Sequence, residues 1–224
     1  MSDPIVRPST CGALAYKCFA RVFTESADPV LYLIASGFQP AGDYQLFFKH
    51  DGGFNWTLFE RVPKIFPPLT TWYVASTTTS QPVLDAPATV SITDSFGTHA
   101  VQVEPWVSSA AQTGTVDSAT PGTVQPSHAL GIDYRVFSRA ADGANSAVLF
   151  PFATCYYMTG GWKVSLEGAG AAGWVFQETV PEIVNFLITY YEASFTTAFP
   201  LLDPAPVVQI RDGWGVHQVP VTPW

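Results

Sequence analysis

The sequence has few charged residues. Lys and Arg together number 10 and Asp and Glu number 18, so 12% of the 224 residues are charged, where a typical soluble chain has about 25%. The formal net charge of −8 shows that basic residues are the scarcer kind. Nucleic acid and anionic lipid surfaces both require a basic face, and we therefore expect neither as a partner.

Long apolar runs are missing as well. No stretch of the sequence is long and apolar enough to span a membrane, and residues 1–10 lack the basic start and apolar core of a signal peptide. We therefore expect no membrane insertion, and a location in the cytoplasm or in an assembled particle.

Cysteine is scarce, and familiar catalytic motifs are not visible. The cysteines are odd in number, Cys11, Cys18 and Cys155, and free thiols in a reducing compartment are the simplest interpretation. The sequence contains no nucleophile elbow, no paired-histidine metal motif and no phosphate-binding loop. We therefore predict no cofactor, and a function in binding or assembly rather than catalysis.

What the chain does contain is an internal repeat. Residues 90–106 return as residues 208–224, an offset of 118. The same offset, without a gap, makes roughly a third of residues 14–106 identical to their counterparts, so the chain is predicted to be a tandem duplication. The matches include Tyr16 with Tyr134, Phe19 with Phe137, Arg21 with Arg139, Trp56 with Trp174, Glu60 with Glu178 and His99 with His217.

The repeat sets the expected domain boundaries. Residues 1–106 are the first repeat with an N-terminal arm, residues 132–224 are the second, and residues 107–131 join them as a linker. The linker has almost no charge and is longer than the loops usual inside a compact domain. Each repeat has the size of a small sandwich domain.

Alternation of apolar and polar residues predicts strands. Residues 16–23 alternate, residues 30–36 are rich in β-formers, and residues 43–49 and 55–62 flank a Gly-Gly turn. Pro151 lies in the second copy of residues 30–36 and predicts a bulge or an edge position there. Short strands with turn signals at intervals of about 8–12 residues indicate an all-β fold of two tandem antiparallel β-sandwich domains.

The closing hairpin of each repeat carries a resemblance. Its pattern is Val-x-Ile-x-Asp-x-x-Gly followed by alternating Val, with turns from Asp94 to Gly97 and from Asp212 to Gly215. This hairpin resembles the closing hairpin of bacterial immunoglobulin-like β-sandwich repeats. The resemblance implies an immunoglobulin-like sandwich in an adhesive, spacer or carbohydrate-associated role. The Cys…Trp…Cys pattern of true immunoglobulin domains is absent.

Each hairpin also places an aspartate and a histidine on either side of its turn, Asp94 with His99 and Asp212 with His217. A carboxylate can fix the tautomer of an imidazole, as catalytic and metal-binding pairs require, so these four residues are the candidates for a metal site. His99, however, has the same parity as the valines that follow it and is expected to face the core. A structural hydrogen bond that closes the turn is the interpretation we favour.

One strand of each repeat carries basic residues on both sides of a phenylalanine. In the first repeat Arg21 lies two positions after Phe19, and in the second Arg139 lies two positions after Phe137. If this strand face is exposed, the phenylalanines are apolar anchors with basic flanks, which suits a protein interface, and Trp224 is a further candidate contact. The alternative is an ordinary edge strand protected by its charges.

Trp56 and Trp174 allow two interpretations. Exposed aromatic rings stack on sugars, so a glycan is a possible ligand, whereas buried ones fill the two cores, as large aromatic side chains usually do. We favour the core.

Two classes of function therefore remain open. The first is a structural or assembly subunit, and the second is a carbohydrate-binding, lectin-like module; an enzyme with a site between the domains has no motif in its favour. Hydrophobic residues make up 47% of the chain, more than two small cores can easily bury. We therefore expect a homo-oligomer or an assembly with a partner protein.

Overall fold

The computed structural model of the chain describes residues 5–23, 28–64, 67, 70–79, 81–107, 120–141, 146–168, 173–183, 185–197 and 200–224. These residues form strands, turns and loops and contain no helix, which confirms the predicted all-β class. None of them, therefore, belongs to an apolar helix able to cross a membrane. The chain divides into two compact units, Met1–Trp106 and Val107–Trp224, which we call unit 1 and unit 2.

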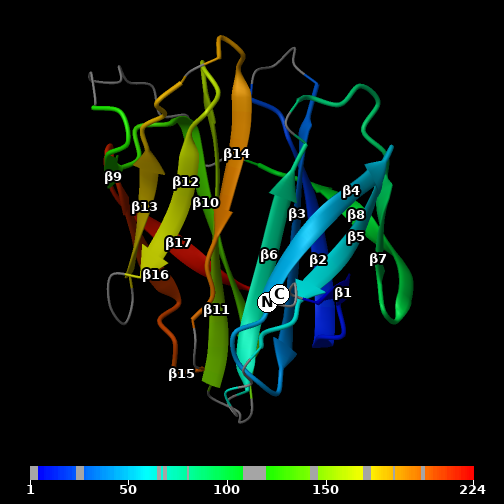
Figure 1. The fold of residues 1–224 in the computed structure, drawn as a ribbon. Helices are drawn as coiled ribbons and strands as arrows, with labels where there is room; N and C mark the ends of the chain where they lie inside the picture. Colours follow the sequence, from blue (N-terminus) through cyan, green and yellow to red (C-terminus); the bar gives the residue numbers. More distant parts are fainter. Residues whose placement is uncertain are drawn as a thin grey trace. The chain divides into compact units, whose positions relative to one another are not determined.

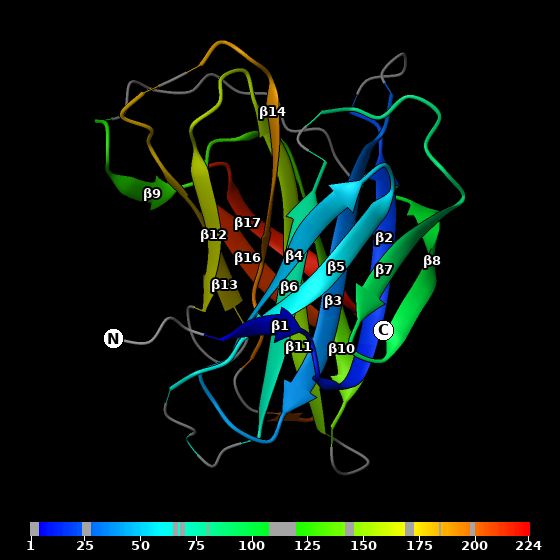
Figure 2. The ribbon, with the colours of Figure 1, turned by 45° about the vertical axis from the view of Figure 1, so that its right-hand side comes forward.

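Unit 1 is an eight-stranded sheet that folds over on itself. Its strands are β1 (Val6–Pro8), β2 (Gly12–Arg21), β3 (Val30–Gln39), β4 (Gln45–Gly52), β5 (Asn55–Arg61), β6 (Thr71–Thr78), β7 (Thr89–Asp94) and β8 (Gly97–Pro105). The order in the sheet is β1-β5-β7-β8-β2-β3-β6, and β4 pairs with the other side of β5. In Figure 1, β2, β3 and β6 run side by side; Figure 2 shows β4 and β5 crossing over β3 as a second layer.

Unit 2 repeats this arrangement with one additional short strand. Its strands are β9 (Val124–Pro126), β10 (Leu130–Ala140), β11 (Ser146–Tyr157), β12 (Lys163–Gly168), β13 (Gly173–Thr179), β14 (Thr189–Ser194), β15 (Leu201–Leu202), β16 (Val207–Asp212) and β17 (Gly215–Pro223). The order is β12-β13-β16-β17-β10-β11-β14, with β9 on β13 and β15 on β11. Strands that correspond by the offset of 118 thus take the same places in both sheets, as a duplication predicts.

The pairing is not antiparallel throughout, and the prediction was wrong in this respect. β7 runs parallel to β5, and the last residues of β8 run parallel to β2; the same holds for β16 with β13 and β17 with β10. The first part of β8 pairs with β7 and its end pairs with β2, so this one strand belongs to both layers. Alternation along a strand shows which side chains face the core, but it says nothing about the direction of the neighbour.

Each unit has one core between its two layers. In unit 1 the buried cluster joins residues of both layers: Cys18, Leu31, Leu33, Ala35, Trp56, Leu58, Ala75, Val90, Ile92 and Val101. The corresponding cluster of unit 2 includes Trp174, Phe176, Val208 and Ile210. Because side chains alternate along a strand, Glu60 follows Trp56 and Leu58 to the same buried side of β5.

The predicted linker, residues 107–131, is wrong at its end. Residues 108–119 lie outside the described residues, but β9 is a strand of unit 2 that pairs with β13, and β10 already begins at Leu130. β9 corresponds to β1, which pairs with β5 in the same register. In the sequence, the correspondence of these two strands shows only as a short motif: Val-x-Pro-Ser occurs at residues 6–9 and again at 124–127.

Pro151 does not cause the predicted bulge or edge position. It lies inside β11, between β10 and β14, opposite Val136, and no register shift occurs there. Its carbonyl accepts a hydrogen bond from Phe195 N–H, so its own missing N–H faces the same side. The paired ladder with β14 ends next to it, at Phe152 and Ser194, and proline is tolerated there because the ladder loses little.

A β-bulge interrupts the same point of β2 and β10. The register shifts between Gly12 and Ala15 and between Leu130 and Asp133. The bulged residue has a positive φ in both units, +48° at Ala13 and +56° at Gly131. Glycine adopts this conformation without strain, whereas alanine carries a Cβ that crowds the backbone.

We predict that Ala13→Gly stabilises unit 1 by about 1 kcal/mol, because it removes the strain at positive φ, and that Gly131→Ala destabilises unit 2 by a similar amount. Urea unfolding of both variants measures the two changes. Equal destabilisation by the two substitutions would show that the bulge does not impose this backbone conformation.

Candidate functional site

A tyrosine joins the predicted aspartate–histidine pair of unit 1. Asp94 at the end of β7 is buried, and His99 Nε2 lies 3.0 Å from its Oδ2 atom. The Tyr16 hydroxyl from β2 donates to the same oxygen at 2.5 Å, and Phe96 N–H donates to Oδ1 at 2.7 Å. The Tyr16 and His99 rings lie with their centroids 5.4 Å apart. The sequence predicted the aspartate–histidine contact, and the structure adds the phenol.

Unit 2 contains the same cluster at the corresponding residues. The Tyr134 hydroxyl donates to Asp212 Oδ2 at 2.6 Å, and His217 Nε2 lies 3.0 Å from that atom. The backbone N–H groups of Trp214 and Gly215 donate to Oδ1. Conservation of the whole cluster between two copies with different turn residues indicates that all three side chains act together.

The electrostatics keep the two phenols neutral. Burial, and with it the neighbouring carboxylate, raises the pKa of Tyr16 and of Tyr134. A neutral phenol donates a hydrogen bond to the aspartate, so each carboxylate receives at least one side-chain and one backbone hydrogen bond. This geometry closes a turn and fixes the orientation of an imidazole. Among the described residues, no group of three or more His, Cys, Asp or Glu side chains could hold a metal ion.

A second polar cluster surrounds Glu60, which the sequence analysis did not single out as a site. This carboxylate is fully buried on β5. Arg7 Nε of β1 donates to Oε1 at 2.7 Å, and Gln39 Nε2 of β3 donates to Oε2 at 2.7 Å. Thr10 donates both its N–H and its hydroxyl. Glu60 thus ties the first strand of the unit to both layers.

Glu178 does the same in unit 2 with other donors. Gln125 Nε2 of β9 donates to Oε1 at 2.8 Å, and the backbone N–H of His128 donates to Oε2 at 2.8 Å. The Tyr157 hydroxyl donates to Oε2 at 2.5 Å from the position that corresponds to Gln39. The donating side chains differ between the two units, but each corresponding position still supplies a hydrogen-bond donor to the glutamate.

The two clusters of a unit are linked through one serine. In unit 1 the Ser9 carbonyl accepts from both the N–H and the hydroxyl of Ser95, the residue after Asp94. In unit 2 the Ser127 carbonyl accepts from Gly213 N–H at 2.8 Å. The duplicated Val-x-Pro-Ser motif therefore ends at the residue that connects the first strand to the turn of the closing hairpin.

Of the residues predicted as an interface, the two phenylalanines and Arg21 are buried, whereas Arg139 and Trp224 are partly exposed. Phe19 and Phe137 are buried, and each meets a tryptophan ring nearly edge-on, Trp106 and Trp224 respectively, with centroids 5.4 Å apart. Arg21 is also buried. The structure thus brings each phenylalanine together with the tryptophan that follows the closing hairpin. A part for these residues in an interface stays a prediction.

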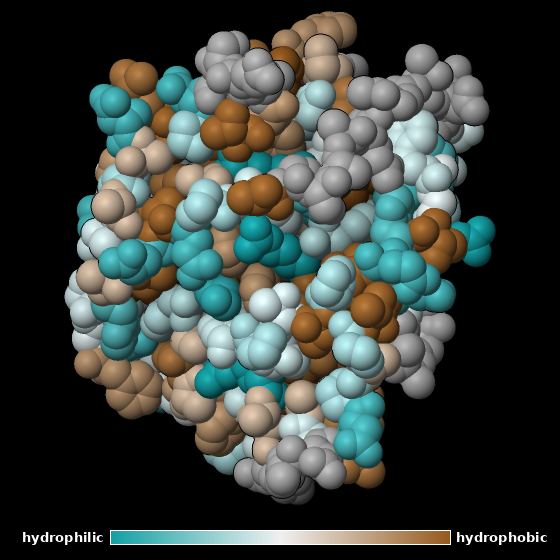
Figure 3. Space-filling view, turned by 180° about the vertical axis from the view of Figure 1, so that it is seen from behind, coloured by the Kyte–Doolittle hydropathy of each residue, from teal (hydrophilic) through white to brown (hydrophobic). Residues whose placement is uncertain are grey.

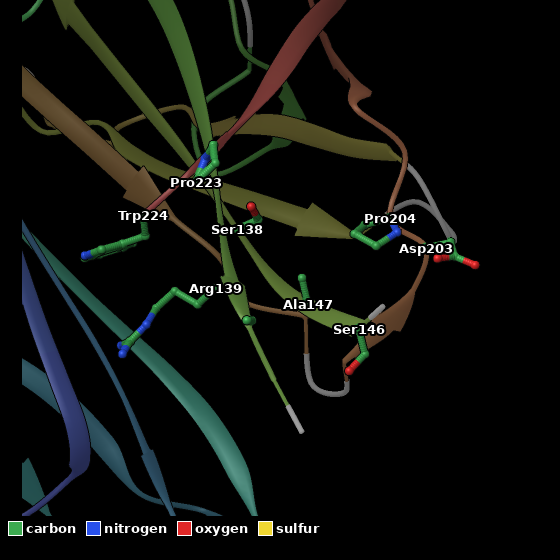
Figure 4. Close-up of a pocket in the computed structure, with 9 residues that line it drawn as sticks. Ser138, Arg139, Ser146, Ala147, Asp203, Pro204, Pro223 and Trp224 are labelled. Carbon is green, nitrogen blue, oxygen red and sulfur yellow. The ribbon is translucent and has the colours of Figure 1, made fainter. Parts of the chain in front are cut away.

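A groove of about 760 Å³ lies beside Arg139 and Trp224 in unit 2. Burial lowers the pKa of the Arg139 guanidinium. In Figure 4, Arg139 and Trp224 point to one side, away from Asp203 and Pro204 on the other side of the groove. The polar groups do not converge on one point, as they would in a site built for a small ligand.

Apolar side chains reach the surface at several separate places, as the face in Figure 3 shows. Among the described residues, the two most exposed large apolar side chains, Phe186 and Ile183, belong to the connection between β13 and β14. Ile183 is 84% exposed, Phe186 89%, Leu187 61% and Ile188 44%. We call residues 181–183 and 185–188 the tip loop. Four large apolar side chains are thus exposed on one short segment, which is unusual in a monomeric protein.

The tip loop is held in place by the turn that follows β11. Gly160 N–H donates to both the side-chain and the backbone oxygen of Asn185, at 2.8 and 3.0 Å. A Cβ atom at Gly160 would lie 2.3 Å from Asn185 Oδ1, and one at Gly161 would lie 2.6 Å from the Ile183 carbonyl oxygen. Glycine at both positions therefore allows the loop to pack closely, and its apolar side chains project from a fixed base.

No protein-family model, curated protein or solved structure matches the chain.

We predict that Tyr16→Phe and Tyr134→Phe each lower the free energy of unfolding by about 1–3 kcal/mol, because a buried carboxylate loses a donor. His99→Ala and His217→Ala should cost less, since both imidazoles are partly exposed. Urea unfolding at pH 7 gives these values. A larger loss for the histidine variants would contradict the structural role of the phenol.

The phenols also predict a pH dependence. Their folded pKa lies above the unfolded value of about 10, so their contribution to stability is complete below pH 10 and is lost as the pH rises through the folded pKa. The free energy of unfolding should therefore fall above pH 10, and fall less in the Tyr16→Phe, Tyr134→Phe double variant. Tyrosinate absorbance that appears in full near pH 10 in the folded protein would contradict this prediction.

For the glutamate clusters we expect Glu60→Ala and Glu178→Ala each to cost at least about 3 kcal/mol, because several buried donors lose their acceptor. Glu104→Ala is the matched control: this carboxylate is exposed and lies 3.9 Å from Lys17 Nζ, so its loss should cost less than about 1 kcal/mol. Thermal or urea unfolding compares the three variants, and equal losses would argue against the clusters as structural ties.

Proposed function

We propose that this chain is a non-catalytic structural or assembly subunit that acts through protein–protein contacts, with two immunoglobulin-like β-sandwich units as its scaffold. The observation that supports the proposal is the tip loop, whose four large apolar side chains are exposed on a fixed base. Side chains of this kind, ordered before contact, supply interface area at low entropic cost.

The polar clusters support the same proposal. In each unit the aspartate, histidine and tyrosine are engaged with one another, and the buried glutamate accepts hydrogen bonds from several elements. Carboxylates satisfied in this way act as structural ties, and duplicated clusters are what a repeated scaffold requires.

The carbohydrate-binding alternative depended on exposed rings of Trp56 and Trp174. Both are buried in their cores, where each lies opposite an isoleucine of the neighbouring strand, so neither offers a face to a sugar. We therefore do not propose a glycan site at Trp56 or Trp174, and the lectin-like alternative stays a prediction.

An interface that includes Phe19, Phe137, Arg21, Arg139 and Trp224 remains a prediction. These side chains form matching aromatic and cationic sets in the two units. Because the phenylalanines are buried, their substitution by Asp would disturb folding as well as association, and it does not test assembly cleanly.

Self-assembly is tested by the mass in solution. Light scattering at micromolar concentration should give a mass well above the 24.2 kDa of one chain, and the value should rise with concentration. The mass should persist at about 1 M salt, because apolar contacts are not screened. A constant mass near that of one chain, at every concentration, would argue against an assembly subunit.

A further inference from the structure

The tip loop lies beside a cavity, and three of its residues form part of the cavity wall. The cavity holds about 380 Å³ and is lined by Gly122, Gly161, Lys163, Thr179, Val180, Pro181, Glu182 and Ile183. Its wall is fixed by backbone hydrogen bonds from Gly122 N–H to the Val180 carbonyl and from Val180 N–H to the Thr123 carbonyl. A protruding ring and an open cavity thus occupy the same end of unit 2.

We infer that the tip loop binds a second copy of this chain, with Phe186 of each copy entering the cavity of the other. The inference rests on the proposed assembly function and names its contact. A cavity of about 150 Å³ is already large enough for benzene, so this one has room for a benzyl group. Val180, Pro181 and Ile183 supply apolar contacts for the ring.

The symmetry of such a pair follows from the position of the two features. A twofold interface uses the same patch on both copies, and it requires that the patch complement itself. Here Phe186 lies on the tip loop, and the cavity lies at the base of the same loop. A single twofold rotation therefore forms both contacts at once. The pair closes, and the tip loop does not lead to open filaments.

The area and the charges agree with a second copy. The exposed side chains of the tip loop offer roughly 500 Å² per copy, so a pair buries about 1,000 Å², near the lower limit for a specific interface. Glu182 and Lys163 both line the cavity. We therefore place the Glu182 of one copy opposite the Lys163 of the other in the twofold pair. An anionic membrane would meet a chain of net charge −8 and is disfavoured.

The test begins with Phe186→Asp in the full chain. The ring is 89% exposed, so the variant should keep the melting temperature of the parent and show a weakening of the pair by about 30-fold or more, as loss of a central aromatic anchor does. The matched control is Phe96→Asp: this ring is 67% exposed in the β7–β8 turn of unit 1, and its substitution should leave the mass unchanged.

Charge reversal tests the geometry of the pair. Glu182→Lys and Lys163→Glu should each weaken the association, and the double variant should restore it, because the two charges then face each other in exchanged positions. If the double variant associates no more strongly than the single variants, the twofold arrangement is overturned.

The remaining outcomes separate this inference from the function on which it rests. An oligomer that persists in Phe186→Asp overturns the tip-loop contact and leaves assembly intact. A monomeric wild type at all concentrations overturns both. Flotation of a monomeric wild type with phosphatidylcholine vesicles, lost in Phe186→Asp, would assign the loop to a lipid surface and overturn the inference as well.

Discussion

Each unit depends on a carboxylate taken out of water. Glu60 and Glu178 lie on the core side of a central strand, where an unsatisfied charge would cost more than any nearby apolar contact contributes. The first strand of the unit is short, and the residue two positions after it and a side chain of the neighbouring layer both donate hydrogen bonds to this one group. Without the glutamate, the first strand would be held by its short backbone ladder alone.

Comparison of the two units shows which features tolerate change. Around the glutamate, Arg7 is replaced by Gln125 and Gln39 by Tyr157, and a donor is kept each time. Around the aspartate, the tyrosine and the histidine are themselves retained. Between β13 and β14, Ile183 and Leu187 of the tip loop repeat Ile65 and Leu69 of unit 1, whereas Phe186 stands where unit 1 has Pro68. The carboxylates of the polar clusters were thus kept in duplicate, whereas Phe186 is particular to unit 2.

The sequence allowed the all-β class, the positions of most strands and the aspartate–histidine contact to be predicted, because each depends on residues close together in the chain. It did not show the tyrosine partner of Asp94, which is 78 residues distant, or the donors to Glu60. Parallel pairing was missed because alternation does not reveal the direction of a neighbour. β9 was taken for linker because only three of four residues in its motif repeat. Exposure of Phe186 depends on where its loop lies, which no local pattern records.

A strand that is shared by both layers also affects how the chain folds during its synthesis. β8 pairs with β7 and then with β2, which lies more than 80 residues earlier, so the sheet of unit 1 closes through a contact distant in sequence. Folds dominated by such contacts form slowly. During synthesis, the edges of β7 and β2 remain open until Pro105 has left the ribosome, and open edges are where strands of different chains join. Since all eight strands of unit 1 precede residue 107, its sheet can close before any strand of unit 2 exists to compete for those edges.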